Sequence, residues 1–181
     1  GRKVLASELR YADGSYTIDY ADLEEKLSRE TTSLFIFCNP HNPVGKVWDR
    51  PTLERIAELC IKHDVLVVSD EIHCDLTHIG HAYIPLASIS EEIADRTITC
   101  IAPTKAFNIA GLQTAAIVIP NPEIRKQVDR GINTDEVAEP NTFAIQAAEA
   151  AFDEGEDWLE ELREYLELNR EFLIGSLKEL V

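Results

Sequence analysis

The sequence predicts a mixed α/β fold, in which helices cover a mainly parallel sheet. Short apolar runs rich in β-branched residues, at 34–38, 65–69 and 97–101, read as buried strands. Segments of helical periodicity lie between these runs, and this alternation is typical of parallel strands joined by helical crossovers. With 181 residues and a hydrophobic content of 45%, the chain is large enough for one domain with a sizeable core.

The N-terminal segment predicts an edge strand, a turn and a short helix. Residues 3–9 are expected to form the strand, and the Ala-Asp-Gly-Ser sequence at 12–15 predicts the turn. Residues 19–29 predict a helix, because Leu23 and Leu27 stand four positions apart on one face.

The segment 50–63 carries the clearest helical pattern of the chain. Asp49 is expected to cap its first turn with the side-chain carboxylate. Apolar residues recur at the helical spacing i, i+3, i+4, i+7 and i+8. These residues are Leu53, Ile56, Ala57, Cys60 and Ile61.

The second half of the chain predicts one further strand and several helices. A brief helix at 90–95 precedes the strand at 97–101. A strand at about 114–119 ends at Pro120-Asn121-Pro122, and a helix is expected from there through about Arg130.

A loop is expected at 131–141, followed by a helix at 142–152. The segment from about 156 to 180 then predicts a long amphipathic helix with no terminating glycine or proline. This helix is therefore expected to connect to a further domain. Its apolar face carries Leu159, Leu162, Leu166, Leu173, Leu177 and Leu180.

Charge and composition exclude several classes of protein. The formal net charge of −16 argues against nucleic acid as a partner, because phosphate neutralisation needs basic stripes. No apolar run approaches the roughly 18 to 20 residues that span a bilayer, and the first residues do not resemble a signal peptide. The absence of methionine indicates that the chain was processed or cut from something longer.

The four cysteines, Cys38, Cys60, Cys74 and Cys100, lack the paired spacing of zinc sites. They are expected to be buried free thiols in a reducing cytoplasm. The crowded segment His73-Cys74 to His81 also fits no standard zinc pattern, so no metal site is predicted.

Polar motifs follow the ends of the apolar runs 34–38, 65–69 and 97–101, and ligands of open α/β sheets bind beyond the carboxyl ends of strands. Asn42, Asp70 and Lys105 place an amide, a carboxylate and an amine there. A positioned lysine amine can form a Schiff base with an aldehyde cofactor. Pyridoxal phosphate also needs a carboxylate on its ring nitrogen and benefits from a donor to its ring oxygen. These three residues therefore predict a cofactor site.

The motifs resemble those of fold-type I pyridoxal-phosphate enzymes, the aminotransferase class I/II superfamily, over about residues 1–180. They read Asn-Pro-His-Asn-Pro-Val-Gly, Ser-Asp-Glu-Ile-His and Ala-Pro-Thr-Lys-Ala-Phe-Asn. The resemblance implies the three-layer α/β/α large domain of that fold. It also implies that Lys105 binds pyridoxal 5′-phosphate covalently, Asp70 pairs with the ring nitrogen and Asn42 bonds the ring oxygen. Thr104 is a candidate for the cofactor phosphate.

Some positions depart from the common pattern of the superfamily. His73 stands where many members have tyrosine near the ring oxygen, and it is expected to take part in the cofactor site. Gln113 stands where many have the arginine that binds the phosphate, and Ala102 where the family has serine. With these departures, the motifs resemble most closely the carbon–sulfur β-lyases of the cystathionine β-lyase and cystalysin type.

This branch implies cleavage of cystathionine or related cysteine S-conjugates to a thiol, pyruvate and ammonia. An aminotransferase of the same fold is the alternative enzyme, and a non-catalytic module that binds a regulator is the alternative of another class. The resemblance implies an N-terminally incomplete large domain at 1–155, and a helix at 156–181 leading to a C-terminal small domain. It also implies a small amino-acid substrate, a homodimeric parent, and no nucleic-acid or membrane partner.

Overall fold

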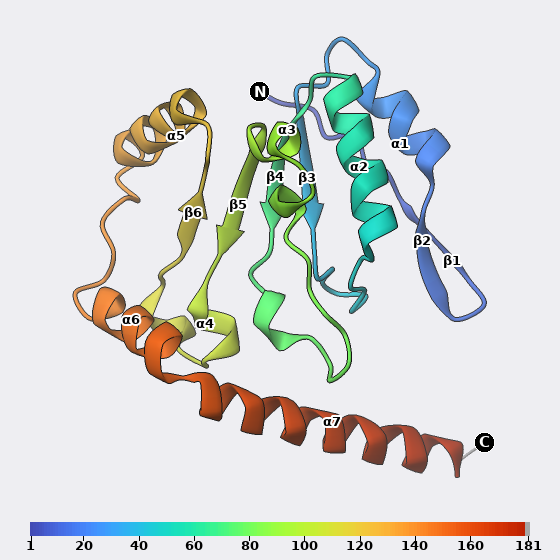
Figure 1. Ribbon diagram of the computed structural model, residues 1–181, viewed down its shortest axis with the longest axis vertical. Coiled ribbons are helices and arrows are strands. Elements are labelled where there is room, and N and C mark those ends of the chain that lie inside the picture. Colours follow the sequence, from blue (N-terminus) through green and yellow to red (C-terminus); the bar gives the residue numbers. More distant parts are fainter. Residues whose placement is uncertain (180–181) are drawn as a thin grey trace.

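The strands form a two-stranded hairpin and a separate four-stranded sheet of order β3-β4-β5-β6 (Figure 1). The computed structural model describes residues 1–179. In the larger sheet β3, β4 and β5 are parallel, and β6 runs antiparallel beside β5. The predicted α/β fold with a mainly parallel sheet is confirmed. The strands are β1 (Leu9–Ala12), β2 (Ser15–Ile18), β3 (Leu34–Cys38), β4 (Leu66–Asp70), β5 (Thr97–Ile101) and β6 (Ala116–Val118).

Helices connect and flank these strands, close to the positions that periodicity predicts. None of the helices within residues 1–179 is both long and apolar enough to cross a membrane. The α-helices are α1 (Tyr20–Leu27), α2 (Arg50–Lys62), α3 (Glu91–Ala94), α4 (Pro103–Ala106), α5 (Pro122–Thr134), α6 (Ala144–Glu154) and α7 (Glu156–Lys178). Short 3-10 turns are η1 (Cys74–Leu76), η2 (Leu86–Ser88) and η3 (Ala110–Leu112).

Helix α2 forms where its capping residue and apolar stripe predict it. The Asp49 carboxylate accepts a hydrogen bond from the Thr52 backbone N–H at 3.1 Å, and Pro51 stands in the first turn, where no N–H is needed. The side chains of Leu53 and Ile56 are fully buried. Local capping and the burial of one face therefore both favour the same helix.

The predicted strand at 3–9 is wrong, since β1 begins at Leu9. Asp13 and Gly14 adopt left-handed conformations with φ of 51° and 75°, which make a two-residue hairpin turn. Pairing then extends outward from Ala12 and Ser15. The turn was predicted correctly, but pairing outward from it forms the strand at Leu9–Ala12 rather than at 3–9.

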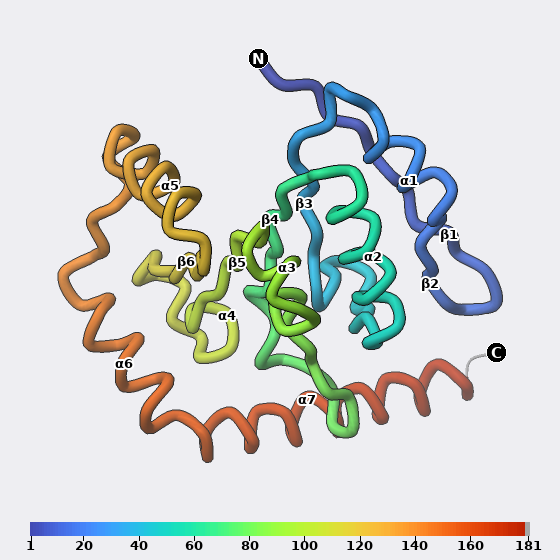
Figure 2. The backbone as a smooth tube through the Cα atoms, turned by 45° about the horizontal axis from the view of Figure 1, so that its top comes forward, coloured from blue at the N-terminus to red at the C-terminus, as the bar shows by residue number. Residues whose placement is uncertain are grey.

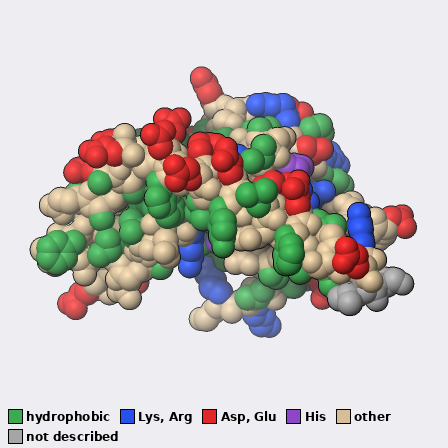
Figure 3. Space-filling model, turned by 90° about the horizontal axis from the view of Figure 1, so that it is seen from below, with side chains coloured by type: hydrophobic (Ala, Val, Ile, Leu, Met, Phe, Trp, Pro, Cys, Tyr) green, Lys and Arg blue, Asp and Glu red, His purple; other side chains and the backbone are tan. Residues whose placement is uncertain are grey.

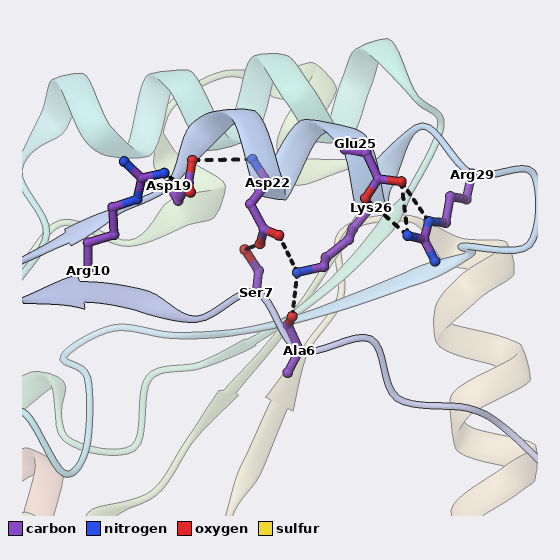
Figure 4. Close-up of polar contacts among 8 residues, drawn as sticks. All are labelled: Ala6, Ser7, Arg10, Asp19, Asp22, Glu25, Lys26 and Arg29. Atoms are coloured by element: carbon purple, nitrogen blue, oxygen red, sulfur yellow. Dashed lines mark hydrogen bonds and ion pairs between the residues drawn. The ribbon is translucent and has the colours of Figure 1, made fainter.

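The segment before β1 is attached to helix α1 by polar contacts instead of strand pairing (Figure 4). The Ser7 hydroxyl donates to the Asp22 carboxylate at 2.7 Å. The Lys26 ammonium donates to the carbonyl of Ala6 at 2.6 Å and also pairs with Asp22. The contact from Lys26 thus satisfies the Ala6 carbonyl, a backbone group that a sheet would otherwise have paired.

The loop predicted at 131–141 begins later than expected, because α5 continues through Thr134. The Thr134 hydroxyl donates to the Arg130 carbonyl at 2.7 Å, and the Asn133 amide donates to the Asp129 carbonyl at 2.8 Å. Both side chains bond back to a carbonyl four residues earlier, within a helix that continues past Gly131. The helix ends before Glu136, whose φ of 55° is left-handed.

The core lies between one face of the larger sheet and the helices α1, α2 and α3, which Figure 2 shows together on one side of the strands. On β3, Phe37 points into this core and is 5% exposed, whereas Ile36 points away and is 70% exposed. Among the described residues the helices thus cover one face of β3. The core side chains include Leu23, Phe37, Leu53, Ile56, Leu59, Val67, Leu86 and Ile93.

Helix α7 passes beneath the carboxyl ends of the parallel strands (Figure 1). The Arg163 Nε donates to the Thr77 carbonyl at 3.1 Å, and His78 lies 3.2 Å from the Glu167 carboxylate. The helix starts where the sequence predicts it, while Leu180 of its predicted apolar face lies outside the described residues. Figure 3, which views this side, shows hydrophobic side chains on the surface; on α7, Leu168, Phe172, Leu173 and Leu177 are exposed.

Candidate active site

The carboxyl ends of the three parallel strands meet at one edge of the sheet. Cys38 pairs in register with Asp70, and Asp70 pairs with Cys100 on the other side. Beyond the strands, the Asn39 N–H donates to the Asp70 carbonyl at 3.0 Å, and the Glu71 N–H donates to the Cys100 carbonyl at 2.9 Å. Asp70 therefore ends the middle one of three parallel strands, at the edge where ligands of such sheets bind.

The Asp70 carboxylate is half-buried, and among residues 1–179 it has no ion-pair partner. Its one hydrogen-bond donor there is the Ile72 N–H, at 3.3 Å. Burial raises the pKa of the Cys38 thiol, a backbone contact from Asn42 opposes this, and the Asp70 charge adds to the rise. Burial, followed by the charges of Asp70 and Glu71, raises the pKa of the Cys100 thiol. Both thiols are thus held neutral beside a carboxylate that can accept a cation.

Asn42 is exposed in a turn that folds back on itself directly after β3. The His41 N–H donates to the Lys46 carbonyl at 2.7 Å, and the Gly45 N–H donates to the His41 carbonyl at 2.7 Å. Gly45 has a φ of 68°, a conformation that glycine adopts without strain. The turn places Asn42 beyond the end of β3, at the same edge of the sheet as Asp70.

Lys105 and Thr104 lie on α4, which begins at Pro103 immediately after β5. The sequence predicted this motif without its helix, which is only four residues long. Lys105 is exposed, and no hydrogen bond or ion pair joins its ammonium to another residue of the described part of the chain. Thr104 is buried, with 9% of its surface exposed.

His73 is half-buried and directly precedes the turn η1, three residues beyond Asp70. Within residues 1–179 no hydrogen bond joins it to Asn42, Asp70 or Lys105. In the same stretch of described chain, no group of three or more metal-ligating side chains is close enough to hold a metal ion. His78, from the same crowded segment, pairs with Glu167 of α7 instead.

The residues present at this edge fit pyridoxal phosphate by their chemistry. Three polar groups lie at the ends of three adjacent strands. They are the Asp70 carboxylate, which has no ion-pair partner among the described residues, the Lys105 amine, which also has no partner there, and the exposed Asn42 amide. Within residues 1–179 no hydrogen bond or ion pair joins Asn42, Asp70 and Lys105 to one another, so each polar group can face a bound molecule. The amine suits the aldehyde of that cofactor, the carboxylate suits its ring nitrogen and the amide suits its ring oxygen.

Sequence reasoning passed over two fully buried polar residues beside the site, Asn39 and Glu71. The Asn39 amide donates to the Ile84 carbonyl at 3.1 Å and accepts from the Trp48 N–H at 3.1 Å. The Glu71 carboxylate accepts from Ser69 and from the Leu86 N–H. Their signal in the sequence was a polar residue directly after a strand, since Asn39 follows Cys38 of β3 and Glu71 follows Asp70 of β4.

Helix α4 rests on the joint between α6 and α7 through an aromatic cluster. The ring of Phe107 lies 6.1 Å from that of Phe152 and 5.9 Å from that of Trp158, centre to centre. Gly155 forms the joint, and a Cβ atom there would lie 2.5 Å from a ring carbon of Phe107 and 2.3 Å from the Ala151 carbonyl oxygen. The absence of a side chain at 155 lets the joint approach the segment that carries Lys105.

We expect Gly155→Ala to destabilise the protein by about 1–3 kcal/mol, because its methyl group would collide with the Phe107 ring and with the backbone. Thermal unfolding of the purified variant measures the effect. Gly175→Ala is the matched control, since a Cβ at Gly175 in α7 meets nothing within 4 Å. That control should gain roughly 0.5–1 kcal/mol from helix propensity. A Gly155→Ala variant as stable as the parent would contradict the close contact.

The sequence matches the family model described as aminotransferase class I and II over residues 4–180. The chain belongs to this family. Among curated members, cystathionine beta-lyase PatB of Bacillus subtilis is 48% identical over 169 residues, covering 93% of this chain and 44% of PatB. Protein MalY of Escherichia coli is 33% identical and covers 93% of this chain and 42% of its own length.

Solved structures of the family superpose on nearly the whole chain. Cystalysin from Treponema denticola, which contains a pyridoxal 5′-phosphate cofactor, gives a TM-score of 0.93 with 37% identity over 95% of this chain and 44% of its own. A PLP-bound putative aminotransferase from Clostridium difficile gives a TM-score of 0.94 with 44% identity, covering 98% and 46%. This chain therefore spans less than half the length of these relatives.

Proposed function

We propose that this chain forms part of a pyridoxal-phosphate-dependent carbon–sulfur β-lyase that cleaves cystathionine or related cysteine S-conjugates to a thiol, pyruvate and ammonia. The observation that carries the proposal is the placement of Asn42, Asp70 and Lys105 after three adjacent parallel strands. The similarity to PatB and cystalysin supports the lyase branch of the family. The pKa values of the Cys38 and Cys100 thiols beside Asp70 are raised, so these thiols add no negative charge there. A protonated ring nitrogen would therefore meet the Asp70 carboxylate.

Each site residue has a role that its chemistry allows. When bound, pyridoxal phosphate supplies an aldehyde and a ring that accepts electrons. With the cofactor bound, the Lys105 amine would be its covalent anchor and, once free, would be the base for the proton on the substrate α-carbon. The Asp70 carboxylate holds a proton at the ring nitrogen, since an adjacent negative charge favours the cation. Asn42 would donate to the ring oxygen, Thr104 would bind the phosphate and His73 would take part in the site near the ring oxygen.

The proposal assigns residues 1–155 to the large catalytic domain and residues 156–181 to a helix that leads to a small domain. It places the parent protein in the cytoplasm as a homodimer, acting on a small amino acid. The free thiols of Cys38, Cys60, Cys74 and Cys100 suit a reducing compartment. The likeness of the chain to relatives about twice its length supports a parent with further domains.

An aminotransferase is the second candidate function. The PLP-bound structure from Clostridium difficile bears the name putative aminotransferase, and kynurenine–oxoglutarate transaminase 3 of the rat is 40% identical over 57% of this chain. Proton removal by Lys105 begins both reactions. They differ in whether a thiolate then leaves from the β-carbon or a proton returns to the cofactor.

Product analysis of the full-length protein tests the proposal. With cystathionine as substrate, we expect a thiol, pyruvate and ammonia in equal amounts. In parallel, the protein is given the same amino acid with a keto acid as amino-group acceptor. Exchange of the amino group, without pyruvate or ammonia, would replace the lyase by the aminotransferase.

A further inference from the structure

A second carboxylate, that of Glu71, lies directly behind Asp70. Glu71 follows Asp70 at the end of β4, so their side chains point to opposite sides of the sheet. Asp70 is half-buried at the proposed cofactor edge, whereas Glu71 is 1% exposed inside the protein. A buried carboxylate is costly unless it is paired or well bonded, so its presence calls for a role.

Every partner of the Glu71 carboxylate can donate a hydrogen bond to it. The Ser69 hydroxyl donates to Oε1 at 2.6 Å, and the Leu86 N–H donates to the same oxygen at 3.2 Å. The Tyr83 hydroxyl contacts Oε2. A backbone N–H can only donate, and hydrogen bonds from donors stabilise the ionised form of an acid. These donors favour the negatively charged form of Glu71, and no cation among residues 1–179 pairs with its carboxylate.

The other titratable groups around Glu71 do not offset this charge. Burial raises the pKa of Glu71 itself, Ser69 and Leu86 oppose this, and Asp70 adds to the rise. Burial, Asp75 and, to a smaller extent, Glu71 raise the pKa of the Cys74 thiol to about 12. The Cys100 thiol is also held neutral by burial and by the two carboxylates. The end of β4 thus carries two adjacent carboxylates, and no cation of the described residues pairs with either of them.

The same carboxylate also fastens the segment 83–86 to the end of β4. Asn39, at the end of β3, holds that segment through the carbonyl of Ile84. Segment 83–86 therefore bridges the ends of two strands on the side opposite the Asp70 carboxylate. Motion of either strand end would break buried hydrogen bonds, so the bridge restrains the backbone that carries Asn42 and Asp70.

We propose that Glu71 is a positioning residue for the cofactor site, which holds the end of β4 in place and adds a second negative charge behind Asp70. The inference rests on the proposed function and deepens it. In this proposal the Asp70 carboxylate contacts the ring nitrogen directly. The Glu71 carboxylate, on the buried side, further favours the proton on that nitrogen. The two charges together favour a protonated ring more strongly than Asp70 alone.

Two variants of the full-length protein separate the charge from the hydrogen bonds. Glu71→Gln removes the charge and keeps the shape, and its amide can still accept from Ser69 and Leu86 while donating to Tyr83. Tyr83→Phe removes a donor and leaves the charge. The measurements are the pH midpoint of the visible absorption change of bound cofactor, the cofactor dissociation constant and the thermal midpoint of the cofactor-free protein.

For Glu71→Gln we expect the spectral midpoint to fall by roughly half a pH unit or more, because the lost charge weakens the hold on the proton. Cofactor affinity should fall about threefold or more by the same coupling. Tyr83→Phe should lower the thermal midpoint and leave the spectral midpoint in place. If Glu71→Gln fails to fold, Glu71→Leu combined with Ser69→Ala and Tyr83→Phe removes the charge together with its donors, and the same fall is expected.

An unchanged spectral midpoint in a folded Glu71→Gln protein would overturn the proposal and leave Glu71 as a structural residue. A fall of the same size in Tyr83→Phe would also overturn it, because packing and not charge would then set the midpoint. Failure of the parent protein to bind pyridoxal phosphate has a different meaning. That result would reject the proposed function, and it is seen before any variant is made.

Discussion

Lys105→Ala should abolish the visible absorption band of the lysine-bound cofactor in the full-length protein. It should also lower the rate of pyruvate release by at least about a thousandfold, since the amine is both the covalent anchor and the base for the α-proton. The amine lies on α4, directly after β5, with no partner among the described residues that would occupy it. Absorption spectroscopy and a product assay measure the two effects.

The control for this prediction is Lys126→Ala, which removes an exposed lysine from α5 far along the chain from the site. Its spectrum and rate should match those of the parent. Added small amines should partly restore the rate of Lys105→Ala, because they can take the α-proton in place of the missing side chain. A Lys105→Ala protein that keeps the visible band would show that another residue binds the cofactor.

Asp70→Asn should lower the rate by roughly a hundredfold or more and weaken cofactor binding. Removing one partner of a buried, hydrogen-bonded charge pair typically costs about 2–5 kcal/mol. The asparagine keeps the size of the side chain and can still accept the 3.3 Å hydrogen bond from the Ile72 N–H. The loss therefore reports the charge at the ring nitrogen rather than a change in packing. Equilibrium titration with cofactor and steady-state kinetics measure it.

Asp95→Asn, at the exposed C-terminal end of α3, is the matched control and should leave both measurements unchanged. Asp70→Glu keeps the charge but lengthens the side chain, so its loss should be smaller than that of the asparagine. If Asp70→Asn retained the full rate and affinity, the carboxylate at the end of β4 would not be the partner of the ring nitrogen.

The charge of Asp70 also bears on the thiols beside it. Because Asp70 contributes to the raised pKa of Cys38 and of Cys100, Asp70→Asn should make both thiols ionise at lower pH than in the parent. Burial is the larger cause in each case, so the thiols should remain less acidic than exposed cysteine. The same carboxylate thus adds to the effect of burial on two nearby thiols.

Local patterns in the sequence were sufficient for most helices and strands. The strands 34–38 and 97–101 lie where the apolar runs predict them, and α2 begins after Asp49 as its cap predicts. The motifs at the strand ends also predicted a cofactor site at Asn42, Asp70 and Lys105 without coordinates, and this site stays a prediction. These features depend on neighbours a few residues apart, which is the range over which capping and periodicity act.

The tertiary structure decided the features that join residues distant in the chain. The pairing of β6 antiparallel to β5, the contact of Asn39 with Ile84 across 45 positions and that of Arg163 with Thr77 across 86 have no local signal. Nor does a glutamate in a sequence reveal that it will be buried behind an aspartate. Sequence alone determined which chemical groups stand at the strand ends. Packing decided what holds them there, because long-range contacts depend on how whole elements meet.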